Sequence, residues 1–149
     1  MFIGNVEVKG LARLAPMAGI SNAAYRIVAR ECGSALTTSE EIDATGLTRN
    51  NSKTRYYIAK YLPEEKPIAL QILGAEAEYL VPGVQWLQDQ GADIIDLNMG
   101  CPVQKITKTG RGSAMMKDVA KTAGILEAMR KVLTVPFTIK IRSGWDENT

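Results

Sequence analysis

The sequence predicts an α/β fold with about five parallel strands that alternate with helices, and it favours the N-terminal portion of a (β/α)8 barrel over an open doubly wound sheet. Short apolar runs alternate with longer segments of helical period, which is typical of βαβ units. Polar, glycine-containing loops follow the apolar runs, and no Gly-x-Gly-x-x-Gly follows the first one. A complete barrel needs about 250 residues. The 149 residues of this chain therefore predict one partial-barrel domain over positions 1–149.

The first two strands are expected near the N-terminus. Residues 12–16 form a short apolar run, and Ser21-Asn22 then offers the cap of a helix that ends at Gly33. Residues 35–39 are the second expected strand, and a polar stretch rich in Thr and Asn follows them. Brief apolar strands of this kind are typical of a parallel sheet that is covered on both faces.

The third and fourth strands are expected at residues 68–73, entered through Pro67, and at residues 94–98. Between them, apolar residues at i, i+3 and i+4 spacing begin at Ala77 and predict a helix, which Gly91 ends. Pro82 interrupts this pattern. Two interpretations stay open, because the proline either kinks the helix or marks the first turn of a helix that begins later.

A final helix and strand complete the expected pattern. An apolar stripe runs from Val119 to Leu133, and Asp118 precedes it as a residue that stabilises a helix N-terminus. Pro136 opens the fifth strand at residues 137–141. Residues 146–149 are rich in helix-capping types with no helix after them. We therefore expect the remainder of the barrel to be absent from this chain.

Composition excludes several classes of protein and site. With 46% apolar and 23% charged residues, the chain is expected to fold around a core, and it contains neither a secretory signal nor an apolar run of about 18 residues. We expect a cytoplasmic protein without a membrane partner. The chain has no histidine, so Ser/His and Cys/His nucleophile pairs and histidine metal sites are excluded, and no metal site is predicted. The net charge of +2 is too small to indicate a nucleic-acid partner by itself.

Polar motifs follow the expected strands in a fixed order. They are Ala15-Pro16-Met17-Ala18-Gly19, Ser39-Glu40, Gln71-Ile72-Leu73-Gly74, Asp96-Leu97-Asn98-Met99-Gly100-Cys101-Pro102, Gly110-Arg111-Gly112-Ser113-Ala114 and Lys140-Ile141-Arg142-Ser143-Gly144-Trp145. From Leu14 to Trp145 this ordered set resembles the tRNA-dihydrouridine synthases. The resemblance implies a TIM barrel that binds FMN, with NADPH as the reductant of the flavin and tRNA as the partner. It also implies that reduced flavin passes hydride to a tRNA uridine while a cysteine protonates the neighbouring ring carbon.

Cys101 is the predicted catalytic residue. It matches the family's cysteine by its place in the Asn-Met-Gly-Cys-Pro run. Independently of the resemblance, Gly100 permits a sharp turn and Pro102 stiffens the chain after it, so the thiol is expected at a fixed position at the mouth of the barrel. A proton donor needs such a fixed position close to the atom that it serves. The alternative is a buried structural cysteine that acts as a small apolar residue.

The resemblance also supplies the expected flavin contacts. Main-chain groups and the sulfur of the first loop are expected to lie against the isoalloxazine ring. Amide side chains are expected at an edge of the ring. A lysine is expected near the N1/O2 side, where a cation stabilises the reduced ring. The alternatives are an ordinary turn, barrel-core amides, and a Schiff-base or surface lysine. The predicted cofactor-binding residues are Ala15, Pro16, Met17, Gln71, Asn98 and Lys140.

Substrate contacts are expected from Asn98, Arg142, Lys105 and Arg111. Lys105 and Arg111 belong to a basic cluster after Cys101, for which a tRNA phosphate contact and a solvated loop are both open interpretations. The glycines of this loop, with the adjacent serine, are compatible with a phosphate cradle or with a flexible loop.

Glu41 is a departure from the family pattern, in which methionine is common at this position. Two other functions stay open: a dihydroorotate or dihydropyrimidine dehydrogenase-like FMN barrel, and an inactive half-barrel that self-associates through exposed strand edges. The family's flavin-phosphate loops and its C-terminal helical domain would lie beyond Thr149. We therefore expect the 149 residues alone to be inactive and to bind FMN poorly.

Overall fold

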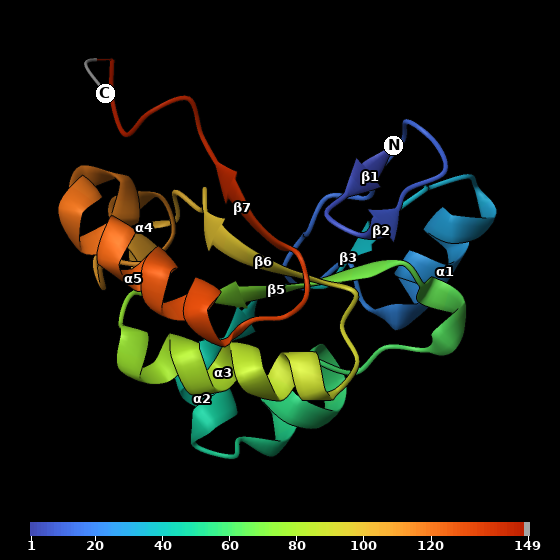
Figure 1. Ribbon diagram of the computed structural model, residues 1–149, viewed down its shortest axis with the longest axis horizontal. Coiled ribbons are helices and arrows are strands. Elements are labelled where there is room, and N and C mark those ends of the chain that lie inside the picture. Colours follow the sequence, from blue (N-terminus) through green and yellow to red (C-terminus); the bar gives the residue numbers. More distant parts are fainter. Residues whose placement is uncertain (148–149) are drawn as a thin grey trace.

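The computed structural model describes residues 1–147 and has an α/β fold in which a curled parallel sheet forms half of a barrel (Figure 1). The predicted fold class is confirmed. All strand pairs of this sheet are parallel. Its order is β3 (Thr37–Thr38), β5 (Ile68–Leu73), β6 (Ile94–Met99) and β7 (Phe137–Ile141), and β4 (Ile42–Asp43) also pairs with β5.

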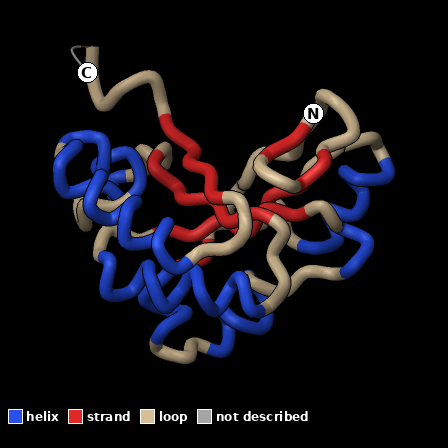
Figure 2. The backbone as a smooth tube through the Cα atoms, in the orientation of Figure 1, coloured by secondary structure: helices blue, strands red, loops and turns tan. Residues whose placement is uncertain are grey.

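Helices alternate with the strands and lie on the convex side of the sheet, whereas the concave side opens away from them (Figures 1 and 2). No helix among the described residues is both long and apolar enough to span a membrane. The α-helices are α1 (Ala23–Glu31), α2 (Ala44–Thr48), α3 (Ala77–Asp89), α4 (Gln104–Thr107) and α5 (Val119–Val132). The shorter elements are the π-helix η1 (Thr54–Ile58) and the 3-10 helices η2 (Pro63–Glu65) and η3 (Gly112–Lys117).

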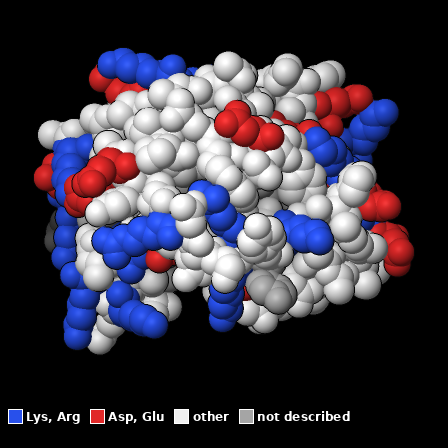
Figure 3. Space-filling view, turned by 90° about the horizontal axis from the view of Figure 1, so that it is seen from below, with Lys and Arg blue, Asp and Glu red and all other residues white. Residues whose placement is uncertain are grey.

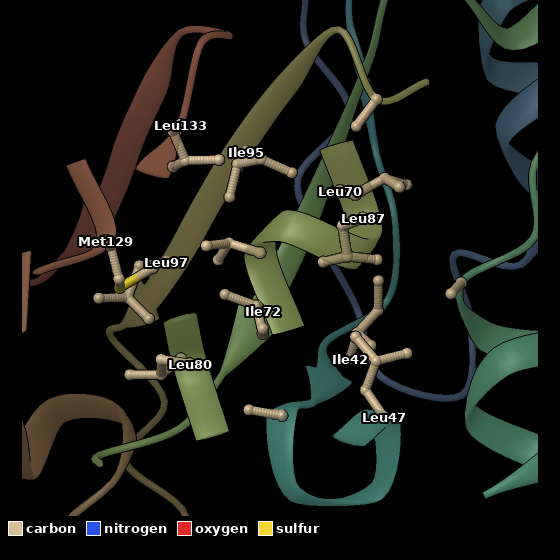
Figure 4. Close-up of a cluster of buried hydrophobic side chains, with 14 of the residues drawn as sticks. Ile42, Leu47, Leu70, Ile72, Leu80, Leu87, Ile95, Leu97, Met129 and Leu133 are labelled. Carbon is tan, nitrogen blue, oxygen red and sulfur yellow. The ribbon is translucent and has the colours of Figure 1, made fainter. Parts of the chain in front are cut away.

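The main core lies between the convex face of the sheet and helices α2, α3 and α5. Alternate residues of β5 and β6 point to this side, so each strand contributes every second side chain to it. Figure 4 shows the packing of Ile42, Leu47, Leu70, Ile72, Leu80, Leu87, Ile95, Leu97, Met129 and Leu133. Burial of such side chains is the main favourable contribution to the free energy of folding.

A second, smaller core lies on the concave side, near the amino ends of the strands. Ala69 and Ile94 contribute to it from β5 and β6, and an N-terminal hairpin that the sequence analysis did not predict packs against it. The hairpin pairs β1 (Phe2–Ile3) with β2 (Val6–Glu7) in antiparallel fashion. The concave face is therefore closed at its amino end, and its carboxyl end is left for a site.

The first expected strand, residues 12–16, does not form, and this prediction is wrong. Only an isolated bridge between Arg13 and Leu36 is present, with a hydrogen bond from the Leu14 N–H to the Leu36 carbonyl. Pro16 lacks the N–H that would continue this ladder. The second expected strand is correspondingly shortened to β3.

The remaining elements agree more closely with the sequence. Strands β5 and β7 have the expected bounds, and Asn22 caps α1 by accepting from the Tyr25 N–H. Helix α3 begins at Ala77, so Pro82 lies within it, and the later start is excluded. The polar stretch after β3 contains β4, α2, η1 and η2, which no apolar pattern predicted.

Candidate active site at the carboxyl ends of the strands

A cavity of about 490 Å³ opens at the carboxyl ends of β6 and β7. Most of the predicted site residues line it, although they come from segments as far apart as the first loop and the end of β7. The lining comprises Pro16, Ala18, Glu41, Asn98, Gly100, Cys101, Pro102, Val103, Lys105, Ile106, Lys140 and Arg142. Parallel strands bring their carboxyl ends to one edge of a sheet, which is why these loops meet.

The Asn98 side chain fixes the backbone that leads into Cys101. Its Oδ1 accepts from the N–H of Gly100 at 3.1 Å and from the N–H of Cys101 at 3.0 Å. This local arrangement is one that asparagine side chains favour at turns. Because two backbone donors face Oδ1, the amide has one orientation, with Nδ2 directed to the opposite side.

The carbonyl group of Cys101 is fixed as well. Ser113 donates to it twice, from its N–H and from Oγ, each at 3.0 Å. Gly112 has a φ of +61°, and a Cβ added there would lie 2.6 Å from the Cys101 carbonyl oxygen. The glycines and serine of this loop, for which the sequence left a phosphate cradle open, thus support the Cys101 backbone. The partly buried thiol lies on a chain segment held on both sides.

A line of hydrogen-bonded polar side chains crosses the concave face below the cavity. Asn98 Nδ2 donates to Gln71 Oε1 at 3.1 Å, and Gln71 Nε2 donates to Asp96 Oδ2 at 2.7 Å. Thr138 Oγ1 donates to the other Asp96 oxygen at 2.6 Å. Asn98 Nδ2 also donates to Glu41 Oε2 at 3.0 Å. Buried polar groups of this kind are stable only when each has partners, and these have them.

Glu41 reaches the concave face because of a β-bulge. Thr38 pairs with Ala69 and Ile42 pairs with Ile72, so four steps along β3 and β4 oppose three steps along β5. The extra residue reverses the alternation of side chains, which directs Ile42 to the outer core and Glu41 to the cavity. Bulges near active sites commonly redirect a side chain in this way.

Burial raises the pKa of two carboxyl groups in this network. For Glu41, burial is the main cause; Arg111 acts in the opposite direction, and Asp43 and Glu40 add to the increase. For Asp96, burial again raises the pKa, against hydrogen bonds from Gln71 and Thr138 and the charge of Lys140. Perturbed carboxyl groups beside a cavity are a common feature of functional sites.

Three cationic side chains line the cavity: Lys105, Lys140 and Arg142. Arg142 Nε donates to the Gly100 carbonyl at 2.6 Å, which adds a third restraint to the Cys101 loop. In the view from the helix-covered side, Lys and Arg gather along the left edge, where α4 and α5 lie in Figure 1 (Figure 3). Asp and Glu lie among them at this edge, and further Lys and Arg lie toward the middle and the right of the same view (Figure 3).

Four predicted site residues lie outside this cavity. Ala15 lines an adjoining cavity of about 430 Å³ on the concave face, which shares Pro16 and Lys140 with the first. Gln71 is fully buried in the polar network. The loop that contains Met17 is closed by hydrogen bonds with the Ser21 hydroxyl.

Arg111 is the fourth of these residues. It lies beside a neighbouring depression, where Asp43 pairs with it at 3.3 Å. Its expected contact with substrate stays a prediction, as do the flavin contacts expected from Ala15, Met17 and Gln71.

Sequence reasoning missed three residues that shape the site. Asp96 lies two positions before Asn98, and strand alternation alone places both on one face, so this signal was available. Ser113 and Glu41 act through contacts between distant segments. No local pattern identifies those contacts, because the Glu41 position depends on a bulge in the register against β5.

Comparisons with known proteins find relatives over nearly the whole chain. A family model described as dihydrouridine synthase (Dus) matches residues 13–149. tRNA-dihydrouridine synthase B of Shewanella oneidensis is 37% identical over 146 residues, which cover 98% of this chain and 45% of that protein. Its counterpart in Pseudomonas aeruginosa is also 37% identical over 146 residues, with 98% and 44% covered. A probable tRNA-dihydrouridine synthase of Rickettsia prowazekii is 33% identical over 147 residues, with 99% and 45% covered. The chain thus spans less than half the length of these relatives.

Proposed function

Because this chain belongs to the dihydrouridine synthase family, we propose that it carries the flavin-facing part of an enzyme that reduces uridine in tRNA to 5,6-dihydrouridine. FMN is the proposed cofactor, NADPH the reductant of the flavin, and Cys101 the proton donor. One observation carries the proposal: a thiol whose peptide N–H and carbonyl are both fixed lies in a cationic cavity at the carboxyl ends of the strands.

The residues around the two adjoining cavities fit a flavin ring. Ala15 and Pro16 offer an apolar wall, and Lys140 lines both cavities as a cation suited to negative charge on a reduced ring. Asn98 lines the cavity at the point where β6 ends. When bound, FMN supplies the hydride for the reaction.

Cys101 supplies the proton in this proposal. The uracil C5–C6 double bond gains a hydride at one carbon and the thiol proton at the other, which balances the two-electron reduction. Asn98 and Ser113 hold the backbone of Cys101, so the thiol needs little reorganisation to face the ring. Solvent returns a proton to the thiolate afterwards.

The cationic side chains support tRNA as the substrate. Lys105 and Arg142 line the cavity, and both are exposed, so they are accessible to the phosphates or the base carbonyls of an RNA strand. A uridine within a folded tRNA has to leave its stack to enter a cavity of this kind.

The decisive experiment is mass analysis of cellular tRNA after deletion of the gene. We expect one or more dihydrouridines to disappear and to return with a wild-type copy, while a Cys101→Ala copy fails to restore them. An unchanged dihydrouridine content in the deletion strain contradicts the proposal. The alternative of a dehydrogenase for free pyrimidines predicts that outcome, together with reduction of the free base by the purified protein.

A further inference from the structure

Glu41 lines the cavity that contains Cys101. Among the described residues, 1–147, it is the one side chain of that lining with a carboxylate oxygen that accepts no hydrogen bond. Its Oε2 accepts from Asn98 Nδ2, and no hydrogen bond to its Oε1 is present among the described residues. The other charged side chains of the lining, Lys105, Lys140 and Arg142, are donors only. Among the charged side chains of this lining, Glu41 is therefore the one that can accept a hydrogen bond from a ligand, and it lies among three donors.

Asn98 does not add a second acceptor. Its Oδ1 accepts two backbone N–H bonds, and its Nδ2 donates to Glu41 and to Gln71, so both ends of the amide are fully used. The hydrogen bond from Asn98 Nδ2 also holds the Glu41 carboxyl group in place at the side of the cavity. Because the carboxylate is already oriented, less side-chain entropy is lost when a ligand forms a hydrogen bond to it.

This arrangement of donors and one acceptor matches a cyclic imide. An imide presents two carbonyl acceptors on either side of one N–H donor, and cations suit the carbonyls while a carboxylate suits the N–H. The uracil ring and the pyrimidine end of the flavin ring share this group. A ring without that N–H leaves Oε1 of the carboxylate without a donor, which is costly in a partly desolvated site.

We infer that Glu41 is a specificity-determining residue that accepts a hydrogen bond from the imide N–H of a ring bound in the cavity. The inference rests on the proposed function for the identity of the ring, which is either the flavin or the substrate uracil. It assigns a ligand contact to a residue that departs from the family pattern, in which methionine is common at this position.

The test compares each ring with its N3-methyl derivative, which lacks the imide N–H. Binding of FMN and N3-methyl-FMN, and of an RNA stem-loop that carries uridine or 3-methyluridine, is measured at about pH 8, where carboxylates are ionised. The proteins are the full-length wild-type enzyme and two full-length variants: Glu41→Met, which removes the acceptor at similar volume, and Glu41→Gln, which keeps an acceptor oxygen. Glu127→Met, at an exposed position on α5, is the matched control.

For one of the two pairs, we expect wild type and Glu127→Met to bind the parent ring about tenfold more tightly than the methylated ring. Glu41→Met should bind both forms alike, and Glu41→Gln should fall between them. The pair that discriminates identifies the ring. The inference is overturned if wild type binds neither ring, or if it binds the parent and the methylated ring of each pair with equal affinity. It is also overturned if Glu41→Met discriminates between parent and methylated ring as strongly as wild type does. Discrimination without any uridine reduction overturns the proposed function alone.

Discussion

At position 101, both neighbouring peptide groups are restrained although the thiol itself is only partly buried. Asn98 restrains the N–H side and Ser113 the carbonyl side. A structural cysteine gains nothing from such restraint, because an apolar contact tolerates small displacements. A general acid depends on it, since proton transfer requires the donor within hydrogen-bond distance of the reacting atom. The restraint of its backbone therefore favours a chemical role for Cys101 over a role in packing.

Replacement of this thiol should separate its chemical role from flavin chemistry. In the full-length enzyme, we expect Cys101→Ala to retain flavin reduction by NADPH and to lose uridine reduction by about 100-fold or more, the contribution typical of a general acid. Single-turnover oxidation of the reduced enzyme by tRNA measures the loss. Cys32→Ala, which removes the exposed second cysteine, is the control and should behave as wild type. Equal losses in both variants would mean that Cys101 is not the acid.

The site residues differ in how far the local sequence identifies them. The motif identified Cys101 and Lys140, because their neighbours in the chain carry the information. In the sequence, Glu41 is only a departure from the family pattern, because its position on the concave face follows from an extra residue in β3 and β4 relative to β5. A register between segments about 30 residues apart is a tertiary property, and local patterns do not contain it.

Among the elements, the 3-10 helix η3 has a role that its length does not suggest. It begins at Gly112, and Ser113 in its first turn donates to the Cys101 carbonyl. A turn that begins with a positive φ fits against this carbonyl only when the residue has no Cβ. This 3-10 helix is thus a support for the loop that contains Cys101.

Gly112→Ala should therefore destabilise the protein. The added Cβ would lie 2.6 Å from the Cys101 carbonyl oxygen, and the backbone conformation is strained for alanine, so we expect a loss of about 1–3 kcal/mol in the free energy of unfolding. Gly124→Ala is the matched control on α5, where an added Cβ meets no atom within 4 Å. That variant should gain about 0.5–1 kcal/mol. Urea unfolding measures both, and an equal effect of the two variants contradicts this account.

Across the whole molecule, a buried ion pair joins α1 to the segment before β5. Arg26 and Glu65 are about 1% and 0% exposed and are paired through Nε and Oε2. Arg26 also donates to the carbonyls of Ser21 and Lys60, and Glu65 accepts from the Leu62 N–H. A charge at such depth is tolerated only with its partner present. The pair therefore fixes the first helix relative to the sheet.

Removal of one partner should be more damaging than removal of both. We expect Arg26→Met to cost about 3–5 kcal/mol, because it leaves the Glu65 carboxylate buried without a counter-charge. The double variant Arg26→Met/Glu65→Leu should recover part of this loss. Thermal and urea unfolding of Arg26→Met, Glu65→Leu and the double variant, compared with wild type, complete the double-mutant cycle. A double variant that is as unstable as the sum of the single ones would show that the two residues are not coupled.

The pH dependence of stability should carry the signature of Asp96. Its pKa in the folded protein lies above the ordinary value of 3.8, so the folded state retains the proton longer than the unfolded state does. The free energy of unfolding therefore decreases as the pH rises from near 3.8 through the folded-state pKa. In Asp96→Asn, which can still accept from Gln71, the contribution of Asp96 to this decrease should disappear, while that of Glu41, whose pKa is also raised, remains. Denaturant unfolding at several pH values compares the two proteins, and parallel curves contradict the prediction.

The architecture was the most predictable property. Short runs of 6 and 5 residues with clear boundaries predicted β5 and β7 to the residue. Strand β5 is buried throughout, whereas no residue of β7 is fully buried. The polar stretch between β3 and β5 was not predicted, because its short elements are stabilised by caps and by contacts between segments. The first strand failed for a local reason that the sequence did contain, namely the missing N–H of Pro16.

The fully used Asn98 amide has a spectroscopic consequence. It joins the Glu41 wall of the cavity to the peptide groups of Gly100 and Cys101, through bonds that polarise one another. A ligand that shares the Glu41 carboxylate changes the electron distribution of the amide and hence the shielding of those two peptide protons. The backbone amide NMR resonances of Gly100 and Cys101 should therefore shift when a ligand binds at Glu41, so binding can be detected without a label on the ligand.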